Sequence, residues 1–380
     1  MDINYEDYFN KTPMHIAVWF DNEEYFKLLR DLQPNDDWKT KYGGSLLDRA
    51  VIKGNTNFLN TLVKAGIDIN STNEKGSTAL EIAKRRNLKE TYQLLMALGA
   101  DSSLVRTIQM KGKYLDENVP GLTPKVFASS FISTEEYEFG SVFNADFTEF
   151  YYGVNVGNRS EIRYSKRNGE EWSKPEALLS NEHYGYNDPF LSPDENRLYF
   201  ISQRPLNEGG EPKEDHDIWY VERTSNGWSE PINAGPNINT EKPEYYISFT
   251  KDGTMYFSSG LDICYAEFIN GEFQKPIFLD DAINTNDYEA DVFVDPDENY
   301  IIFCSMRPGG LGRGDLYISF KNPDSTWTKA VNMGDTINTE GHELCPFVTA
   351  DGKYLLYTSN EDIVWVSTEV IKIIEENIKR

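Results

Sequence analysis

The chain has 380 residues, which is long enough for two or more domains with cores of their own. It carries 37 lysines and arginines against 62 aspartates and glutamates, so its net charge is −25. Such a charge argues against nucleic acid and against an anionic membrane as partners, because both attract a basic surface. The 23 tyrosines and 21 phenylalanines favour a strand-rich structure.

Targeting and redox signals are few in this sequence. The start of the chain lacks the basic segment and apolar run of a secretory signal, and no apolar stretch approaches the ~18 residues of a membrane helix. We therefore predict a cytoplasmic protein without a membrane span. The three cysteines, Cys264, Cys304 and Cys345, lie in predicted strands of different repeats, so we expect small buried side chains and no disulfide framework.

Residues 1–103 repeat with a period of 33 residues. Two kinds of position mark the period: Ala17, Ala50 and Ala83, and Leu29, Leu62 and Leu95. Each alanine lies in a segment of similar sequence (TPMHIA, SLLDRA, STALEIA), followed by a polar break and an apolar helix such as FLNTLVKAG. The period, the TPLHxA-like opening and the AGIDIN or LGAD endings resemble the ankyrin family. The second opening departs from that family because it lacks the Thr-Pro pair and the histidine, and the first connection carries LQPNDDWKTKYGG.

The ankyrin resemblance implies a short stack of helix pairs with a concave face that binds protein. The alanines would let two helices approach closely, and His15 looks like the histidine that hydrogen-bonds within the family's turn. Three repeats are close to the minimum for a free-standing stack. We therefore expect a cap on the last repeat, either from Leu104–Met110 or from docking on the second domain. Residues 104–123 have weak periodicity and a Pro-Gly pair near their end, and are predicted to form a linker.

The remaining residues, 124–380, contain five versions of a second repeat, clearest in YEADVFVDPDENYIIFCSMRPGGLGRGDLYISF. Each version has two apolar runs joined by a turn, then a loop and a third strand. Four versions add a short fourth strand centred on an aromatic residue. The turn aspartates are Asp146, Asp194, Asp252, Asp297 and Asp351, and an INT tripeptide begins at Ile238, Ile283 and Ile337. Aspartate favours turns through its own hydrogen bonds, so these residues need no catalytic role.

These repeats resemble TolB-type, WD-repeat-like propellers over residues 124–369, as in SPDENRLYFISQRP and DPDENYIIFCSMRPGGLGRGDLY. The resemblance implies a β-propeller of five blades; six blades, the alternative, would need a further copy that the sequence does not display. The fifth copy lacks its fourth strand, while Lys125–Ser133 is a strand-like segment outside any copy. We expect this segment to supply the missing outer strand and close the ring, which removes open sheet edges. The predicted fold is therefore multidomain, with a short ankyrin helical stack followed by the propeller.

A glutamate precedes the turn aspartate by eight residues in four copies: Glu138, Glu244, Glu289 and Glu343. The second copy has Tyr186 at this place, with Asp188 close by. Since the first strand of each blade lines the channel of a propeller, we expect these side chains around one mouth of the channel. One interpretation is an acidic mouth for a cation, an amine or a basic peptide, because clustered like charges need a positive partner. The other is structural, with each glutamate accepting hydrogen bonds from a neighbouring blade.

Two arginines, Arg204 and Arg307, precede loops that end at Asp217 and Asp315. A guanidinium forks well onto a carboxylate, so each arginine is expected either to pin its loop to that aspartate or to bind a ligand carboxylate or sugar. His342, beside one of the glutamates, is the only histidine that the repeat places near the channel. Metal sites need several converging ligands, so we predict neither a metal nor another cofactor.

The sequence favours a non-enzymatic interaction or scaffold protein. The ankyrin face would bind a protein or peptide, and the propeller mouth would bind a protein, a cation or a small polar ligand, although neither fold specifies its ligand. No Ser-His-Asp arrangement and no GxSxG elbow is present. The alternative is a glycoside-processing enzyme that uses Glu289 and Glu343, since two carboxylates about 5–10 Å apart can serve that chemistry.

Overall fold

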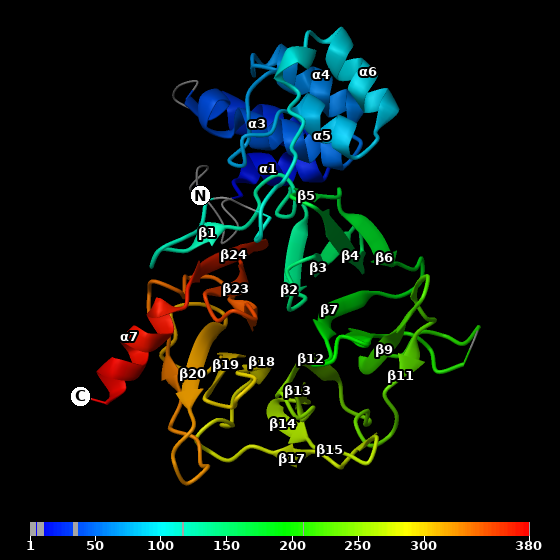
Figure 1. Cartoon of the computed structure of the whole chain (residues 1–380). Helices are drawn as coiled ribbons and strands as arrows, with labels where there is room; N and C mark the ends of the chain where they lie inside the picture. The colour runs from blue at the N-terminus through cyan, green and yellow to red at the C-terminus, as the bar shows by residue number, and fades with distance from the viewer. Residues whose placement is uncertain (1–4, 6–10, 33–36, 116–117, 208, 380) are drawn as a thin grey trace. The chain divides into compact units, whose positions relative to one another are not determined.

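The structure is a computed structural model that describes residues 5, 11–32, 37–115, 118–207 and 209–379 (Figure 1). The chain divides into two compact units, Met1–Gln109 and Met110–Arg380, called here the helical unit and the propeller unit. This division falls inside the segment 104–123 that the sequence predicts as a linker. Among the described residues, no helix is both long and apolar enough to cross a membrane. The predictions on the first ten residues, apart from residue 5, lie outside the described residues.

The helical unit contains six α-helices that follow one another as three pairs within its described residues. They are α1 (Pro13–Trp19), α2 (Glu23–Asp31), α3 (Asp37–Ile52), α4 (Thr56–Lys64), α5 (Ala79–Arg85) and α6 (Lys89–Ala97), followed by the 3-10 turn η1 (Ser102–Leu104). The repeating alanines and leucines are all buried in one core: Ala17, Ala50, Ala83, Leu29, Leu62 and Leu95. Helix α3 starts earlier than the sequence suggests, because Trp38 is buried against Phe26, 5.9 Å between ring centres. Residues 33–36 of that connection lie outside the described residues.

Helix caps in the first two pairs, and a left-handed turn in all three, define where the second helix of each pair starts. Asn22 and Asn55 cap α2 and α4 by accepting from backbone N–H groups at 2.9 and 3.1 Å. Two residues before each second helix the backbone is left-handed. These residues are Asp21, Gly54 and Asn87, which are 33 residues apart. Aspartate, glycine and asparagine tolerate that conformation best, so the sequence period is also a period of backbone geometry.

Buried polar contacts hold the two ends of the helical unit. His15 Nδ1 accepts from the backbone N–H of Thr12 at 3.1 Å, and its Nε2 lies 2.7 Å from Ser45 Oγ. Both ring nitrogens therefore have hydrogen-bond partners inside the helical unit. At the other end, the Arg106 guanidinium donates to both carboxylate oxygens of Glu81 at 2.9 Å. Val105 packs against the same core. The segment after α6 therefore covers the last helix pair.

The propeller unit contains five antiparallel sheets arranged as blades around a centre (Figure 1). Blade 1 contains β2 (Tyr137–Phe143), β3 (Glu149–Val156), β4 (Arg159–Asn168), β5 (Glu171–Trp172) and β6 (Glu176–Leu179). Blade 2 contains β7 (Tyr186–Leu191), β8 (Arg197–Ser202), β9 (Asp217–Thr224), β10 (Gly227–Trp228) and β11 (Ile232–Asn233). Blade 3 contains β12 (Glu244–Phe249), β13 (Met255–Ser259), β14 (Asp262–Ala266) and β17 (Ile277–Phe278), beside the hairpin β15 (Phe268–Ile269) and β16 (Glu272–Phe273).

Two further blades complete the circle. Blade 4 contains β18 (Glu289–Val294), β19 (Tyr300–Ser305), β20 (Asp315–Phe320) and β21 (Val331–Asn332). Blade 5 contains β22 (Leu344–Val348), β23 (Tyr354–Ser359), β24 (Asp362–Ser367) and β1 (Lys125–Val126), and helix α7 (Glu369–Ile378) follows it. The first strands contact one another in a circle, β2 with β7, β7 with β12, β12 with β18, β18 with β22, and β22 with β2. The number of blades agrees with the five repeats of the sequence.

The outer strand of blade 5 comes from the start of the propeller unit. Strand β1 pairs antiparallel with β24, with Lys125 opposite Trp365 and Val126 opposite Val364. Only these two residues of the predicted segment Lys125–Ser133 form a strand, because the chain then turns, with left-handed backbone at Ala128 and Ser130.

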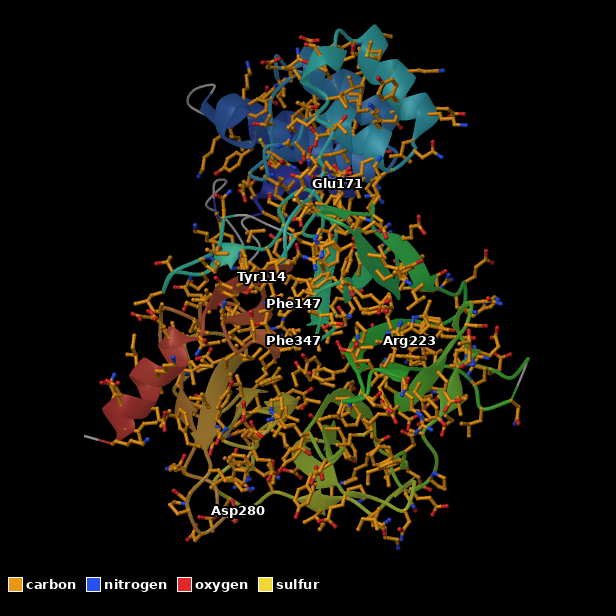
Figure 2. All side chains as sticks on the ribbon, in the orientation of Figure 1. Tyr114, Phe147, Glu171, Arg223, Asp280 and Phe347 are labelled. Carbon is orange, nitrogen blue, oxygen red and sulfur yellow. The ribbon has the colours of Figure 1, made fainter. Side chains whose placement is uncertain are left out.

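The segment Met110–Leu115 packs on the propeller and is not a free linker. The backbone carbonyl oxygens of Met110 and Gly112 accept from the backbone and indole N–H groups of Trp172 in blade 1, at 3.0 and 2.8 Å. Tyr114 donates its hydroxyl to Asp351 in blade 5 at 2.5 Å, and its ring contacts Phe147 (Figure 2). The segment thus bridges blades 1 and 5. Its sequence shows no strand pattern because its contacts are with distant parts of the chain.

Candidate functional site

The four repeating glutamates are buried, with exposed fractions of 1% or less, and do not line an open channel. In each case the threonine four residues earlier donates its hydroxyl and its backbone N–H to the carboxylate. In blades 3, 4 and 5 a serine at the end of the second strand also donates: Ser259 to Glu244, Ser305 to Glu289 and Ser359 to Glu343. Each carboxylate therefore binds the segment that leads into its own blade.

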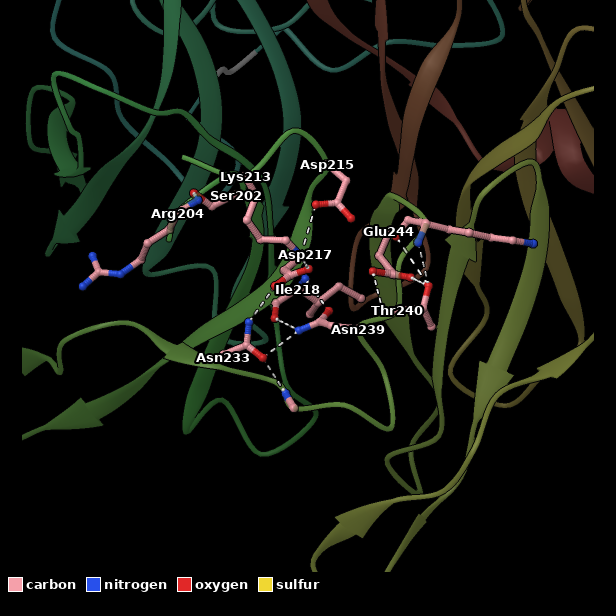
Figure 3. Close-up of polar contacts among 12 residues, drawn as sticks. Ser202, Arg204, Lys213, Asp215, Asp217, Ile218, Asn233, Asn239, Thr240 and Glu244 are labelled. Atoms are coloured by element: carbon pink, nitrogen blue, oxygen red, sulfur yellow. Dashed lines mark hydrogen bonds and ion pairs between the residues drawn. The ribbon is translucent and has the colours of Figure 1, made fainter. Parts of the chain in front are cut away.

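The INT tripeptides are part of this same connection. Their isoleucines are buried, and their asparagines bond both backbone groups of a third-strand residue; Asn239, for example, accepts from Ile218 N–H and donates to its carbonyl at 2.7 and 2.9 Å (Figure 3). Their threonines, Thr240, Thr285 and Thr339, are the ones that donate to the glutamates. The tripeptide thus joins one blade to the next, which explains why INT and the glutamate recur together.

Burial opposes the ionisation of two of these carboxylates, Glu244 and Glu343. It raises the pKa of Glu244 to about 7, although hydrogen bonds from Thr240 and Ser259 act against that rise. Burial likewise raises the pKa of Glu343. Glu289 has in addition an ion pair with Arg307, 3.0 Å between Oε1 and Nη2, in which both side chains are largely buried. These contacts match the structural interpretation of the glutamates.

Arg204 and Arg307 do not pair with Asp217 and Asp315. Asp315 accepts instead from the backbone N–H groups of Leu311 and Gly312 at 2.7 and 2.9 Å, and Asp217 pairs with Lys213 (Figure 3). The predicted arginine–aspartate contacts are therefore wrong, because the loop backbone and a nearer lysine reach the aspartates first. The guanidinium groups lie over third-strand aromatic rings.

A different set of residues meets at the axis, one from the first strand of each blade. Every first strand has a β-bulge or register shift, and within it one residue has a left-handed backbone: Gly140, Asp188, Tyr246, Asp291 and Cys345, with φ between 41° and 53°. For residues other than glycine this conformation is strained, and bulges of this kind redirect side chains. Each of these residues lies two positions after the glutamate or, in blade 2, after Tyr186.

Contacts between blades show that these five residues converge. Asp188 Oδ1 lies 3.5 Å from Cys345 Sγ, and the Cys345 backbone hydrogen-bonds the Asp291 carboxylate. The Tyr246 hydroxyl donates to the carbonyl oxygen of Pro346 at 2.8 Å. A side chain at Gly140 would come within 2.8 Å of Asp188 Oδ1, so only glycine fits there. The axis therefore holds two carboxylates from non-adjacent blades, one beside a thiol and the other beside a backbone group of the same cysteine.

The two aspartates are held in an environment that opposes their ionisation. Burial, and then the charge of Asp291, raises the pKa of Asp188 to about 8, while burial raises the pKa of Asp291 to about 6. Asp188 is 7% exposed, whereas Asp291 is only half-buried. A thiol is a weak donor compared with a hydroxyl or an amide N–H. The pair thus lacks the stabilising partners that each repeating glutamate has.

Tyrosines lie on one side of these carboxylates and phenylalanines on the other. Burial, with further contributions from the charges of Asp188 and Asp291, raises the pKa of Tyr137, Tyr245 and Tyr288. Further along the same strands, Phe347 contacts Phe190 and Phe293, 5.9 and 6.1 Å between ring centres, and lies near the middle of the ring (Figure 2). The axis is therefore filled on the phenylalanine side. On the tyrosine side the three rings are partly exposed, and this end of the axis, next to Asp188 and Asp291, is called here the axial mouth.

Of the predicted site residues, only Asp188 belongs to this axial mouth. Tyr186 is buried beside Arg204, and the glutamates belong to the blade connections. The His342 Nε2 lies 3.5 Å from the buried Cys304 sulfur. Burial lowers the pKa of the histidine and raises that of the thiol, which favours the neutral form of both side chains. Within the described ranges, no group of three or more His, Cys, Asp or Glu side chains is arranged to hold a metal ion.

Sequence reasoning missed Asp291, Cys345 and Tyr246. A signal was available, because all three stand two residues after a repeating glutamate. The spacing alone is a weak signal, because the residue type at that position changes from blade to blade.

A cavity of about 520 Å³ lies between blades 2 and 3, beside the turns that join their first and second strands. Its lining includes Arg197, Arg223 and Lys251, but each of these cations is paired, with Glu222, Glu149 and Asp297 respectively. The cavity therefore offers no unpaired cation, and we assign it no ligand.

No protein-family model and no curated protein sequence matches the chain. Among solved structures it is similar to TolB from Acinetobacter baumannii, with a TM-score of 0.40 and 14% identity over 62% of this chain and 55% of that one. A protein from Agrobacterium tumefaciens assigned as a TolB gives 0.37 and 17%, over 60% and 71%. The tricorn protease gives 0.40 and 10%, over 62% of this chain and 26% of that one. The five-bladed fold rests on the strand topology described above.

Proposed function

We propose that this protein is a non-enzymatic binding protein whose propeller axis accepts a cationic group of a partner, such as an amine or a basic side chain. The observation that carries the proposal is the meeting of Asp188 and Asp291 at the axis, with a thiol and a backbone group as their neighbouring donors. Both carboxylates contact the same residue, Cys345, and two buried carboxylates so placed ionise together at low cost only when a positive charge accompanies them. A bound cation would supply that charge.

The surroundings of the two aspartates suit a cation rather than an anion. Tyr137, Tyr245 and Tyr288 surround the mouth, and the faces of aromatic rings attract a cation through their quadrupoles. The net charge of −25 favours approach of a positive ligand from a distance. The half-buried Asp291 is the carboxylate that such a group would reach first.

Calorimetric titration with a short peptide tests this function. The peptide has blocked ends and one central lysine, and its control has norleucine in place of that lysine. We expect saturable binding of the lysine peptide alone, weakened at least about tenfold by Asp291→Asn. The matched variant Asp297→Asn removes a charge from an exposed turn and should leave binding unchanged. Equal binding of both peptides, or equal loss in both variants, would exclude a cation site at the axis.

The glycosidase alternative has weaker support. Glu289 and Glu343 are fully buried, and each carboxylate accepts hydrogen bonds from a threonine and a serine. At 0% exposure, neither carboxylate is accessible to a sugar from solvent. Turnover of an oligosaccharide that Glu343→Gln abolished without lowering the melting temperature would reverse this preference.

Two finer features of the fold belong to the same proposal. We take the helical unit to be a three-repeat ankyrin stack that binds protein, on the basis of its three helix pairs and the left-handed turns 33 residues apart. We also take strand β1 to close the ring of blades, since it pairs with β24 before the chain enters blade 1. Replacing Val126 by proline should then lower the melting temperature of the propeller, whereas no change would argue against closure by this strand.

A further inference from the structure

Blades 2 and 4 each carry an arginine at the same place in the repeat. Arg204 and Arg307 follow the last serine of the second strand by two residues, and their backbone N–H groups donate to Ser202 and Ser305 Oγ at 3.1 and 3.2 Å. Both guanidinium groups lie over an aromatic ring of the third strand, Trp219 at 5.6 Å and Tyr317 at 4.6 Å. The fold thus presents two arginines in equivalent positions, and their partners can be compared directly.

In blade 4 the protein neutralises its own arginine. The Arg307 Nη2 donates to Glu289 Oε1 at 3.0 Å and to the carbonyl oxygen of Ile283 at 2.8 Å. Its Nε donates to Ser305 Oγ at 3.0 Å. The guanidinium therefore donates to three acceptors, one of them a carboxylate.

In blade 2 the carboxylate is missing, because Tyr186 replaces the glutamate. The Arg204 Nη1 donates to the hydroxyl oxygens of Tyr184 and Tyr186 at 3.2 and 3.4 Å. Among the described residues Arg204 has no ion pair. The nearby Asp217 is already held by Lys213 and Asn233, and the Arg204 guanidinium points away from them (Figure 3).

We infer that Arg204, with Tyr184 and Tyr186, binds a carboxylate group of a ligand or partner. A phenol that accepts a hydrogen bond from a guanidinium still has its own O–H to donate. The buried Tyr186 uses its O–H on the Tyr184 hydroxyl, so Tyr184, which is partly exposed, can donate to the same anion as the arginine. The planar guanidinium pairs with a carboxylate through two parallel N–H groups. In blade 4 the equivalent arginine holds an internal carboxylate, Glu289, through a single N–H of its Nη2. This site is separate from the axial cation site and does not depend on it.

The overall charge of the protein makes the site easier to test. A net charge of −25 repels anions, so non-specific attraction cannot account for saturable binding of a carboxylate. Any such binding must come from a local cation without a carboxylate partner, which the repeat comparison places at Arg204.

The test is a titration of the full chain with acetate, followed through the ¹⁵N-labelled arginine Nε–Hε resonances at constant ionic strength. Arg204→Gln identifies the resonance of Arg204. We expect a saturable shift of that resonance with acetate and none with acetamide, the uncharged ligand of the same shape. The Arg307 resonance is the internal control and should not move, since its carboxylate is already in place.

Tyr186→Glu restores to blade 2 the carboxylate that blade 4 has. It should weaken the acetate response of Arg204 at least about tenfold. If that variant does not fold, Tyr184→Phe removes one donor at a partly exposed position and should weaken the response severalfold. The inference is overturned if acetate produces no saturable shift, if Arg204 and Arg307 respond alike, or if inorganic phosphate alone shifts the resonance.

Discussion

Two kinds of buried carboxylate occur in the propeller unit, and they differ in the donors around them. Glu244, Glu289 and Glu343 each accept from a threonine hydroxyl, a backbone N–H and a serine hydroxyl. Asp188 and Asp291 instead both contact Cys345, Asp188 through the thiol and Asp291 through the backbone. Burial opposes the ionisation of both kinds, but each donor offsets part of that cost, so a buried carboxylate with fewer donors is the less stable one. The second kind is therefore the better indication of a ligand site.

The largest effect is expected for Glu289→Ala. This change leaves Arg307 buried without its carboxylate and removes the acceptor of Thr285 and Ser305. Breaking one side of a buried ion pair costs about 3–5 kcal/mol in the free energy of unfolding. Urea denaturation followed by far-ultraviolet circular dichroism measures it, with Asp297→Asn as the exposed control, for which we expect a change below about 0.5 kcal/mol. A loss no larger than that of the control would mean that the glutamate is not a structural anchor.

The opposite sign is expected for Asp188→Asn. The folded state raises the pKa of Asp188 to about 8, above the ordinary value of 3.8, so the carboxyl group stabilises the fold when protonated. That contribution is fully present below pH 3.8 and is lost as the pH rises towards 8. The asparagine variant should therefore be more stable than the natural chain at pH 8, by on the order of 1–3 kcal/mol, and equal to it near pH 4.

Melting temperatures measured between pH 4 and pH 8 check this prediction. The natural chain should lose stability relative to Asp188→Asn across that range. A constant difference, or a variant that is less stable at pH 8, would show that Asp188 has donors beyond the thiol at 3.5 Å. In that case the contrast between the two kinds of carboxylate would disappear.

An intermediate effect is expected for Thr240→Val. The threonine hydroxyl donates to Glu244 at 2.7 Å, and valine has nearly the same shape without the donor. We expect a loss of about 1–2 kcal/mol in the free energy of unfolding, together with a further rise in the pKa of Glu244 above about 7. Side-chain carboxyl NMR shifts measured against pH give that pKa. An unchanged pKa would mean that the remaining donors are sufficient.

The sequence predicts the five blade repeats directly but does not predict the residues at the propeller axis. Both results have the same cause. Residues that recur in each blade, such as the glutamates and the INT tripeptides, recur because each blade needs the same joint to the next. Their periodicity reveals the five blades directly. Recurrence also made Glu138 and its equivalents look like a ring of ligands, although they are used in that joint.

The axial residues could not be found by alternation along the strands. A bulge shifts the phase of a strand, so simple alternation does not give the residue that faces the axis. At the axial position the residue type changes among the blades, from Gly140 and Asp188 to Tyr246, Asp291 and Cys345. Arg204 follows the same rule, since its environment differs from that of Arg307 only where Tyr186 departs from the repeat. Both proposed ligand sites therefore lie where the chain departs from its repeat.

The smallest effect is expected for Asp351→Asn, which extends the comparison to a more exposed carboxylate. Hydrogen bonds from Lys113, Tyr114 and Thr349 outweigh burial and lower the pKa of Asp351 to about 2. Its contribution to stability is therefore present above pH 3.8 and is lost as the pH falls towards 2. Lys113 is 43% exposed, so solvent screens the pair and the loss should stay below about 1 kcal/mol at neutral pH. Hydrogen exchange at Tyr114 and Leu115 reports the effect locally, because these residues should exchange faster in the variant while the blade strands do not. Faster exchange in every blade would instead mean that the segment Met110–Leu115 holds the whole ring together through this single carboxylate.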